Sequence, residues 1–205
     1  GRIISPNGEL QVSEVRGRDL IEHYVEDDHQ LSIGDEITGE IDWYRRYSHM
    51  RMHTAQHLMS GLAYELFNGA RTVGNQINID SSRIDLNPIS FNETMLQELS
   101  ESVNYYVNDS LPVLDSIMTR QEINSIMPED RTNMDLLPKS VRDLRVITIG
   151  NGIDLCPCAG THVSNLSEIG GITIISKKSK GKGTQRIKYQ LSDNYTKREP
   201  NSNIV

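Results

Sequence analysis

The sequence predicts an α+β protein, in which a small N-terminal β-barrel-like module precedes an α/β two-layer domain with an antiparallel sheet. Short apolar or alternating runs separated by turn signals occupy the first 46 residues, as in small barrels and sheets. Beyond them, helical patterns interleave with antiparallel strand patterns. We expect a β-rich module at residues 1–46, a second domain at 47–192 and a frayed polar tail at 193–205.

Three short strands are expected in the N-terminal module. They are Ile3–Ile4, Glu9–Val12 and Ile37–Trp43, the last of which alternates between polar and apolar residues. Turn signals at Pro6–Gly8 and Ser32–Asp35 separate them. Several short strands within so little chain favour a small barrel or sheet module.

The clearest helix spans about Met50–Phe67, followed by a stop signal at Gly69. Its apolar residues fall at helical spacing, and they are Ala55, Leu58, Met59, Leu62, Ala63 and Leu66. Residues 71–86 are predicted to be extended, because Gln76–Asp80 and Arg83–Leu86 both alternate.

The remaining elements are predicted from caps, breakers and alternation. In chain order they are a helix at 91–109, a strand at Leu111–Met118, a short helix at Arg120–Met127, a strand at Arg145–Ile149, a tight turn at Asn151–Gly152, and a β-hairpin of Ile169–Lys177 with Gln185–Leu191.

Bulk properties indicate a globular protein without a membrane span. Hydrophobic content of 36% and charged content of 24% are ordinary for soluble domains. The chain has no apolar run near the ~20 residues that a transmembrane helix needs. Cys156 and Cys158 are too few and too close for a disulfide framework, so a reducing, cytoplasmic setting is expected. Because the first residue is Gly1 rather than Met, we expect a chain truncated or processed at its start.

Two motifs about a hundred residues apart combine into a candidate metal site. His53 and His57 are four residues apart, so they share one face of a helix. Cys158 and His162 enclose Gly160, which favours a turn. Three imidazoles and one thiolate suit zinc in type and number. The alternatives are two core histidines with an unrelated cysteine, or Cys156 in place of Cys158.

A cluster of basic residues near the C-terminus contrasts with the net charge of −7. Such a cluster is either a phosphate-contacting patch or a solvated hairpin tip. Its members are Lys177, Lys178, Lys180, Lys182, Arg186 and Lys188.

The paired motifs, His53-Thr-Ala-Gln-His57-Leu and Cys158-Ala-Gly-Thr-His162-Val, resemble the editing domain of alanyl-tRNA synthetase. The resemblance is strongest to the free-standing alanyl-tRNA editing proteins, the AlaX family, in their medium-length form. It extends over about residues 37–191 and includes Ser167–Gly170 and the lysine run. Two departures are Ala159, where glycine is commoner, and the loss of a glycine-rich motif of which only Gly1-Arg2-Ile3 could remain. Thr161 favours the alanyl branch over the threonyl branch, where proline is usual.

The resemblance implies one Zn²⁺ per chain, held by His53, His57, Cys158 and His162. It implies hydrolysis of the ester that joins serine or glycine to a mischarged tRNA(Ala). It also implies that the basic cluster contacts tRNA phosphates. A synthesis site cannot exclude a smaller amino acid sterically, so a second, hydrolytic site is the physical remedy. As candidate catalytic pocket residues the resemblance offers Thr54 and Gln76.

Two other functions remain open at this point. One is editing of a different mischarged tRNA, such as Ser-tRNA(Thr). The other is a tRNA-binding module with a structural zinc, because four protein ligands fill a tetrahedron whereas catalytic zinc keeps an open position. A zinc peptidase is disfavoured, since the helix motif lacks the glutamate of H-E-x-x-H.

Overall fold

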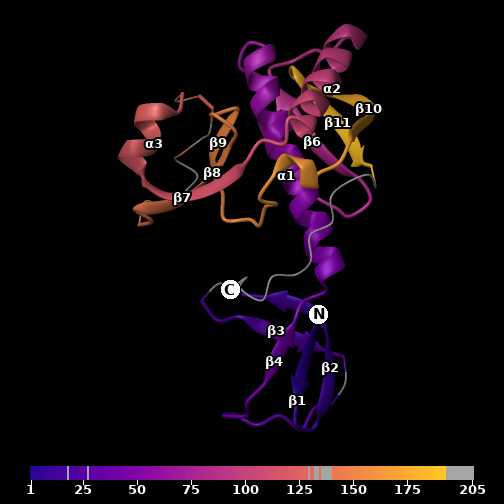
Figure 1. Cartoon of the computed structure of the whole chain (residues 1–205), viewed down its shortest axis with the longest axis vertical. Helices are drawn as coiled ribbons and strands as arrows, with labels where there is room; N and C mark the ends of the chain where they lie inside the picture. The colour runs from indigo at the N-terminus through magenta and orange to yellow at the C-terminus, as the bar shows by residue number, and fades with distance from the viewer. Residues whose placement is uncertain (18, 27, 129, 132–133, 135–139, 193–205) are drawn as a thin grey trace. The chain divides into compact units, whose positions relative to one another are not determined.

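The computed structural model describes residues 1–17, 19–26, 28–128, 130–131, 134 and 140–192, so the predicted tail at 193–205 lies outside the described residues. The chain divides into two compact units, Gly1–Arg46 and Tyr47–Val205. Helices and antiparallel sheets confirm the α+β class (Figure 1). The functional division into a β-rich module and an editing domain stays a prediction. Among the described residues, no helix combines the length and apolar character that a membrane span requires.

The first unit contains one open antiparallel sheet with strand order β3-β2-β1-β4. Its strands are β1 (Arg2–Ser5), β2 (Gly8–Arg16), β3 (Glu22–Val25) and β4 (Thr38–Glu40). The predicted N-terminal β module is confirmed, and of the two forms left open, a small barrel or a sheet, it is a sheet: four short strands are too few to enclose an interior that side chains can fill. Accordingly, none of the described residues in this unit is fully buried.

The long helix α1 (Trp43–Leu66) starts seven residues before the predicted Met50. Asp42 explains the early start. Its Oδ1 accepts a hydrogen bond from the backbone N–H of Arg45 at 3.0 Å, as an N-cap residue does. The predicted strand at Ile37–Trp43 is correspondingly shortened to β4.

The larger sheet of the second unit has strand order β10-β11-β6-β5. Its strands are β5 (Arg71–Gln76), β6 (Ser82–Asn87), β10 (Ile172–Gly181) and β11 (Thr184–Leu191). The C-terminal hairpin is thus confirmed. It starts three residues late, because a 3-10 turn, η2 (Leu166–Glu168), precedes it. The predicted strand at Gln76–Asp80 is wrong beyond Gln76: the Ser82 hydroxyl bonds the backbone of Asn78 and closes a turn there.

Helix α2 (Glu93–Asn108) begins where predicted, because the Asn92 side chain accepts the N–H of Met95. The smaller sheet, order β7-β8-β9, has strands β7 (Val113–Thr119), β8 (Asp143–Ile149) and β9 (Asp154–Pro157). Strand β9 was not predicted, since it is a short edge strand that only pairing with β8 defines. Helix α3 (Arg120–Ile126) packs on this sheet through a core of Ile123, Met127, Leu144 and Val146.

Helix α1 contacts both sheets of the second unit (Figure 1). Toward the larger sheet, the hydroxyl of the fully buried Tyr189 on β11 donates to Met52 O at 2.9 Å. Toward β9, Gly61 lies so close to the carbonyl of Ile153 that a Cβ there would overlap it. The helix face between these contacts carries the two motif histidines.

Candidate metal centre

The structure brings the four predicted ligands together. His53 and His57 project from α1, and Cys158 and His162 lie in the loop after β9. Their ligand atoms all lie within 4.8 Å of one another. Zinc bonds of about 2.0–2.3 Å place tetrahedral ligand atoms roughly 3.5 Å apart, so small side-chain rotations suffice. This cluster, here called the metal centre, is the only such group among the described residues.

Each imidazole of the metal centre has its Nδ1 within hydrogen-bonding distance of an oxygen atom. The pairs are His53 with Thr161 O at 3.3 Å, His57 with Asp154 Oδ2 at 2.7 Å, and His162 with Thr54 Oγ1 at 3.1 Å. An oxygen partner on Nδ1 orients the ring and leaves Nε2 as the metal ligand. All three rings are therefore arranged to present Nε2.

The donor set fits a metal ion. His162 Nε2 is buried and, among the described residues, has no hydrogen-bond partner. Such an orphaned nitrogen is costly unless something binds it. Cys158 Sγ lies 3.7 Å from His53 Nε2, so the thiol faces the imidazoles. Cys156 is not part of the cluster.

Electrostatics favour the ligand form of Cys158. Burial raises the pKa of its thiol, but the neighbouring imidazoles of His162, His53 and His57 outweigh burial and hold that pKa at about 3. Zinc binds the thiolate, so the ligand is already in the required state at neutral pH. Burial lowers the pKa of His57, yet hydrogen bonds with Asp154 and Cys158 raise it to about 9. Burial is the main cause that lowers the pKa of His162 to about 4.

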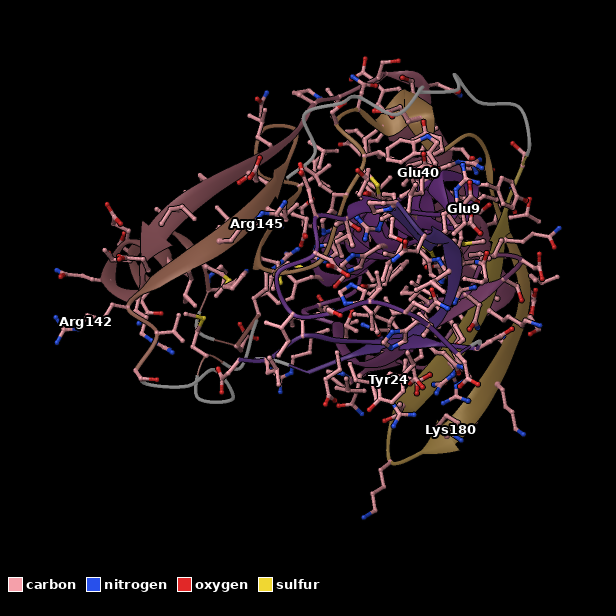
Figure 2. The ribbon with its side chains drawn as sticks, turned by 90° about the horizontal axis from the view of Figure 1, so that it is seen from below. Glu9, Tyr24, Glu40, Arg142, Arg145 and Lys180 are labelled. Carbon is pink, nitrogen blue, oxygen red and sulfur yellow. The ribbon has the colours of Figure 1, made fainter. Side chains whose placement is uncertain are left out.

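The loop that carries Cys158 is held from outside the motif. Arg145 on β8, labelled in Figure 2, donates from Nη1 to Cys158 O at 3.0 Å and to Gly160 O at 2.8 Å. Gly160 packs against His53 so closely that a Cβ would overlap the ring at Cε1. Glycine is thus required at this position because the His53 ring lies so close, and not because the backbone has a positive φ.

We expect Gly160→Ala to weaken zinc binding by about tenfold or more, because the added methyl displaces His53 and zinc bonds tolerate only about 0.2 Å. Chelator competition on the purified variant measures this affinity. Gly39→Ala is the control, since a Cβ at Gly39 meets nothing within 4 Å. Unchanged affinity in Gly160→Ala would show that His53 is not a ligand.

Thr54 was predicted as a pocket residue, and the structure places its hydroxyl in the protein interior. Its Oγ1 donates to Met50 O at 2.9 Å and accepts the N–H of Val163 at 3.2 Å. Because the hydroxyl proton of Thr54 is donated to Met50 O, the imidazole must be the donor in the contact between His162 Nδ1 and Thr54 Oγ1. These contacts orient His162; a direct role in the pocket stays a prediction.

Gln76, the other predicted pocket residue, is exposed at the end of β5 and accepts a hydrogen bond from Arg83 Nε at 3.1 Å. Its register partner is Arg83, whereas Asn75 pairs with Ile84, which is fully buried. Gln76 therefore lies on the opposite face of β5 from Asn75, whose register partner Ile84 belongs to the core, and its role in the pocket stays a prediction.

Sequence reasoning missed Asp154, which is buried and bonds to His57. The one available signal was an acidic residue between the apolar Ile153 and Leu155, two residues before the first cysteine. Arg145, which positions the ligand loop, gave no such signal.

The predicted basic cluster separates into two groups in the structure. Lys177 Nζ donates to Phe91 O at 2.7 Å, and Arg186 makes two hydrogen bonds to Asp85 at 2.7 and 2.8 Å. These two cations serve the fold. The others are exposed on β10, β11 and their turn, as Figure 2 shows for Lys180, and they are Lys178, Lys180, Lys182 and Lys188.

Comparison with known proteins relates the sequence of this chain to alanyl-tRNA editing proteins and to alanine–tRNA ligases. The family model of the threonyl and alanyl tRNA synthetase second additional domain matches residues 144–188. The chain is 34% identical over 163 residues to alanyl-tRNA editing protein AlaX-M of Methanosarcina barkeri, which covers 80% of this chain and 66% of that protein. It is 32% identical over 197 residues to AlaX-M of Saccharolobus solfataricus, and the match covers 93% of this chain and 80% of that protein. Alanine–tRNA ligase of Methanothrix thermoacetophila is 29% identical over 196 residues, or 94% of this chain and 21% of the ligase.

The chain joins an α+β fold to a histidine–cysteine cluster that could hold a metal ion, and its sequence is similar both to free-standing editing proteins and to alanine–tRNA ligases. The chain belongs to the AlaX-M family of alanyl-tRNA editing proteins, which confirms the resemblance seen in its motifs. It spans about two thirds of the length of the first relatives that it matches.

Proposed function

We propose that this protein hydrolyses the ester that joins serine or glycine to tRNA(Ala). It would so remove the wrong amino acid after the synthetase has released the mischarged tRNA. The observation that carries the proposal is the convergence of His53, His57, Cys158 and His162 in a chain of the AlaX-M family. The names of the relatives describe editing of alanyl-tRNA, and the centre supplies a site at which a metal ion could act.

Zinc is the cofactor that we propose, one per chain. When bound, it supplies a Lewis acid that lowers the pKa of water or holds the substrate's amino group. The protein's part is to orient the three imidazoles through their Nδ1 partners. Cys158 serves as a ligand rather than a nucleophile, because its sulfur is enclosed by imidazoles that stabilise the thiolate.

We propose tRNA as the partner of the exposed lysines. Phosphate contacts position an RNA without reading its sequence, which suits exposed Lys178, Lys180, Lys182 and Lys188. Lys177 and Arg186 are engaged by Phe91 O and Asp85, so they contribute less to RNA binding.

We expect Lys180→Gln to raise KM for tRNA and leave kcat unchanged, because it removes one phosphate contact at the hairpin tip. The dependence of log KM on log salt should become shallower by up to about 0.7–0.9. Steady-state deacylation between low and moderate salt measures both. Arg142→Gln is the matched control, since it also removes one exposed cation. An identical salt slope in Lys180→Gln and wild type would exclude the contact.

The test of the proposed function is deacylation of Ser-tRNA(Ala), Gly-tRNA(Ala), Ala-tRNA(Ala) and Ser-tRNA(Thr), with zinc measured on the same sample. We expect loss of serine or glycine from tRNA(Ala) while alanine is retained. Ser-tRNA(Thr) is included because the matching family model spans threonyl and alanyl synthetases. If Ser-tRNA(Thr) were cleaved in preference, it would be the substrate instead of mischarged tRNA(Ala). Zinc-loaded, folded protein that binds tRNA and cleaves none of the four would leave a binding module with a structural metal.

A further inference from the structure

A buried carboxylate lies directly behind the metal centre. Asp154, at the start of β9, has a side chain only 3% exposed. Its two oxygens have different partners: Oδ2 lies 2.7 Å from His57 Nδ1, and Oδ1 accepts from Arg131 Nη2 at 2.6 Å. A buried charge persists only when it is paired and hydrogen-bonded, and both conditions are met here.

Arg131 is itself held in place. Its Nη2 also approaches Ile153 O at 3.3 Å, and its guanidinium lies 4.8 Å from the centre of the Tyr64 ring. The side chain is only 10% exposed. Arg131 therefore fixes one oxygen of Asp154 and directs the other at His57.

We propose that Asp154, held by Arg131, is a positioning residue that keeps a proton on Nδ1 of His57, so that Nε2 is the nitrogen presented to the metal. The inference rests on the proposed zinc site. An ionised carboxylate can only accept hydrogen bonds, so the nitrogen that faces it must carry a proton. The other nitrogen is then available as a ligand, as in carboxylate–histidine–zinc arrangements.

Of the three imidazoles, His57 has the strongest hydrogen bond at Nδ1. His53 Nδ1 faces the neutral carbonyl of Thr161 at 3.3 Å, and His162 faces the neutral hydroxyl of Thr54 at 3.1 Å. The contact between His57 and Asp154 is shorter and involves a charge, and such bonds are roughly twice as strong as neutral ones.

Asp154→Asn tests the proposal with little change in shape. Asparagine has one acceptor oxygen, which cannot serve both Arg131 and His57. If its amide N–H₂ faces His57, the imidazole proton moves to Nε2 and blocks the ligand. We expect the zinc Kd of the folded variant to rise about 10–100-fold, with a changed visible spectrum of the Co²⁺-substituted protein. Asp143→Asn, which removes an exposed carboxylate on β8, should leave both unchanged.

Two further measurements keep the proposal falsifiable if Asp154→Asn fails to fold. Arg131→Met, which frees one oxygen of Asp154, should weaken zinc binding in the same direction but by less. In wild-type protein loaded with zinc, ¹⁵N NMR should show a proton on His57 Nδ1 and none on Nε2. A metal-bound Nδ1, or wild-type affinity in a folded Asp154→Asn, would overturn the proposal. Neither measurement uses tRNA, so failure of zinc-loaded wild type to deacylate would overturn the proposed function alone. Wild type that binds no zinc would overturn both.

Discussion

His57→Ala and Cys158→Ala are each expected to abolish zinc binding and deacylation together. Each substitution removes one of four ligands from a centre whose donors lie within 4.8 Å of one another. His57→Ala also leaves the buried Asp154 without its imidazole partner, and Cys158→Ala removes the thiolate that the three imidazoles surround. Of the changes considered for this protein, these have the largest expected effect on activity.

Zinc content, deacylation rate and thermal unfolding on the same preparations measure this prediction. In wild type, a chelator should lower Tm, because a ligand at a thousandfold excess over its Kd stabilises the fold by about 4 kcal/mol. The chelator should leave the Tm of both variants unchanged. His23→Ala, an exposed histidine in the first unit, is the control and should behave as wild type. Full activity in either metal-free variant would exclude the metal centre as the active site.

Arg51→Met is expected to cost about 3–5 kcal/mol of the free energy of unfolding. Arg51 lies on α1 and is only 6% exposed. It donates to the carbonyls of Glu168, Ile169 and Ser192 at 2.9, 2.6 and 2.7 Å. Methionine fills much of the volume but donates nothing, so three carbonyls lose a charged donor.

The loss should reach the metal centre through Glu168. Its Oε1 accepts the backbone N–H groups of Ser164 and Asn165, both at 3.0 Å, and its Oε2 accepts the hydroxyl of Tyr47 at 2.8 Å. These bonds order the segment that follows His162. We therefore expect weaker zinc binding in Arg51→Met in addition to lower stability.

Urea unfolding of the chelator-treated protein isolates the stability effect from the metal effect. Arg142→Met is the matched control, because the Arg142 side chain is exposed (Figure 2). This substitution should change the free energy of unfolding by less than about 0.5 kcal/mol. A loss below about 1 kcal/mol in Arg51→Met would mean that water or neighbouring donors replace the guanidinium.

Elements with local signals were predictable from the sequence. Asn92 caps α2 and Thr119 forms a capping box with Glu122 at the start of α3, so each helix start is encoded within one turn. The spacing of His53 and His57 likewise fixes both rings on one helix face. The start of α1 escaped prediction because Asp42, the capping residue, lies within a run that alternates like a strand.

The sequence by itself predicted the four candidate ligands, the α+β class and the family, because each depends on residue types within short motifs or at regular spacings. Only the tertiary structure decided what surrounds that set. It placed Asp154 behind His57 across 97 residues of chain, placed Gln76 on the opposite face of β5 from Asn75, and engaged Lys177 and Arg186 in the fold. These contacts join segments far apart in the chain, so no local pattern encodes them; they arise when buried charges and carbonyls find partners as the core packs.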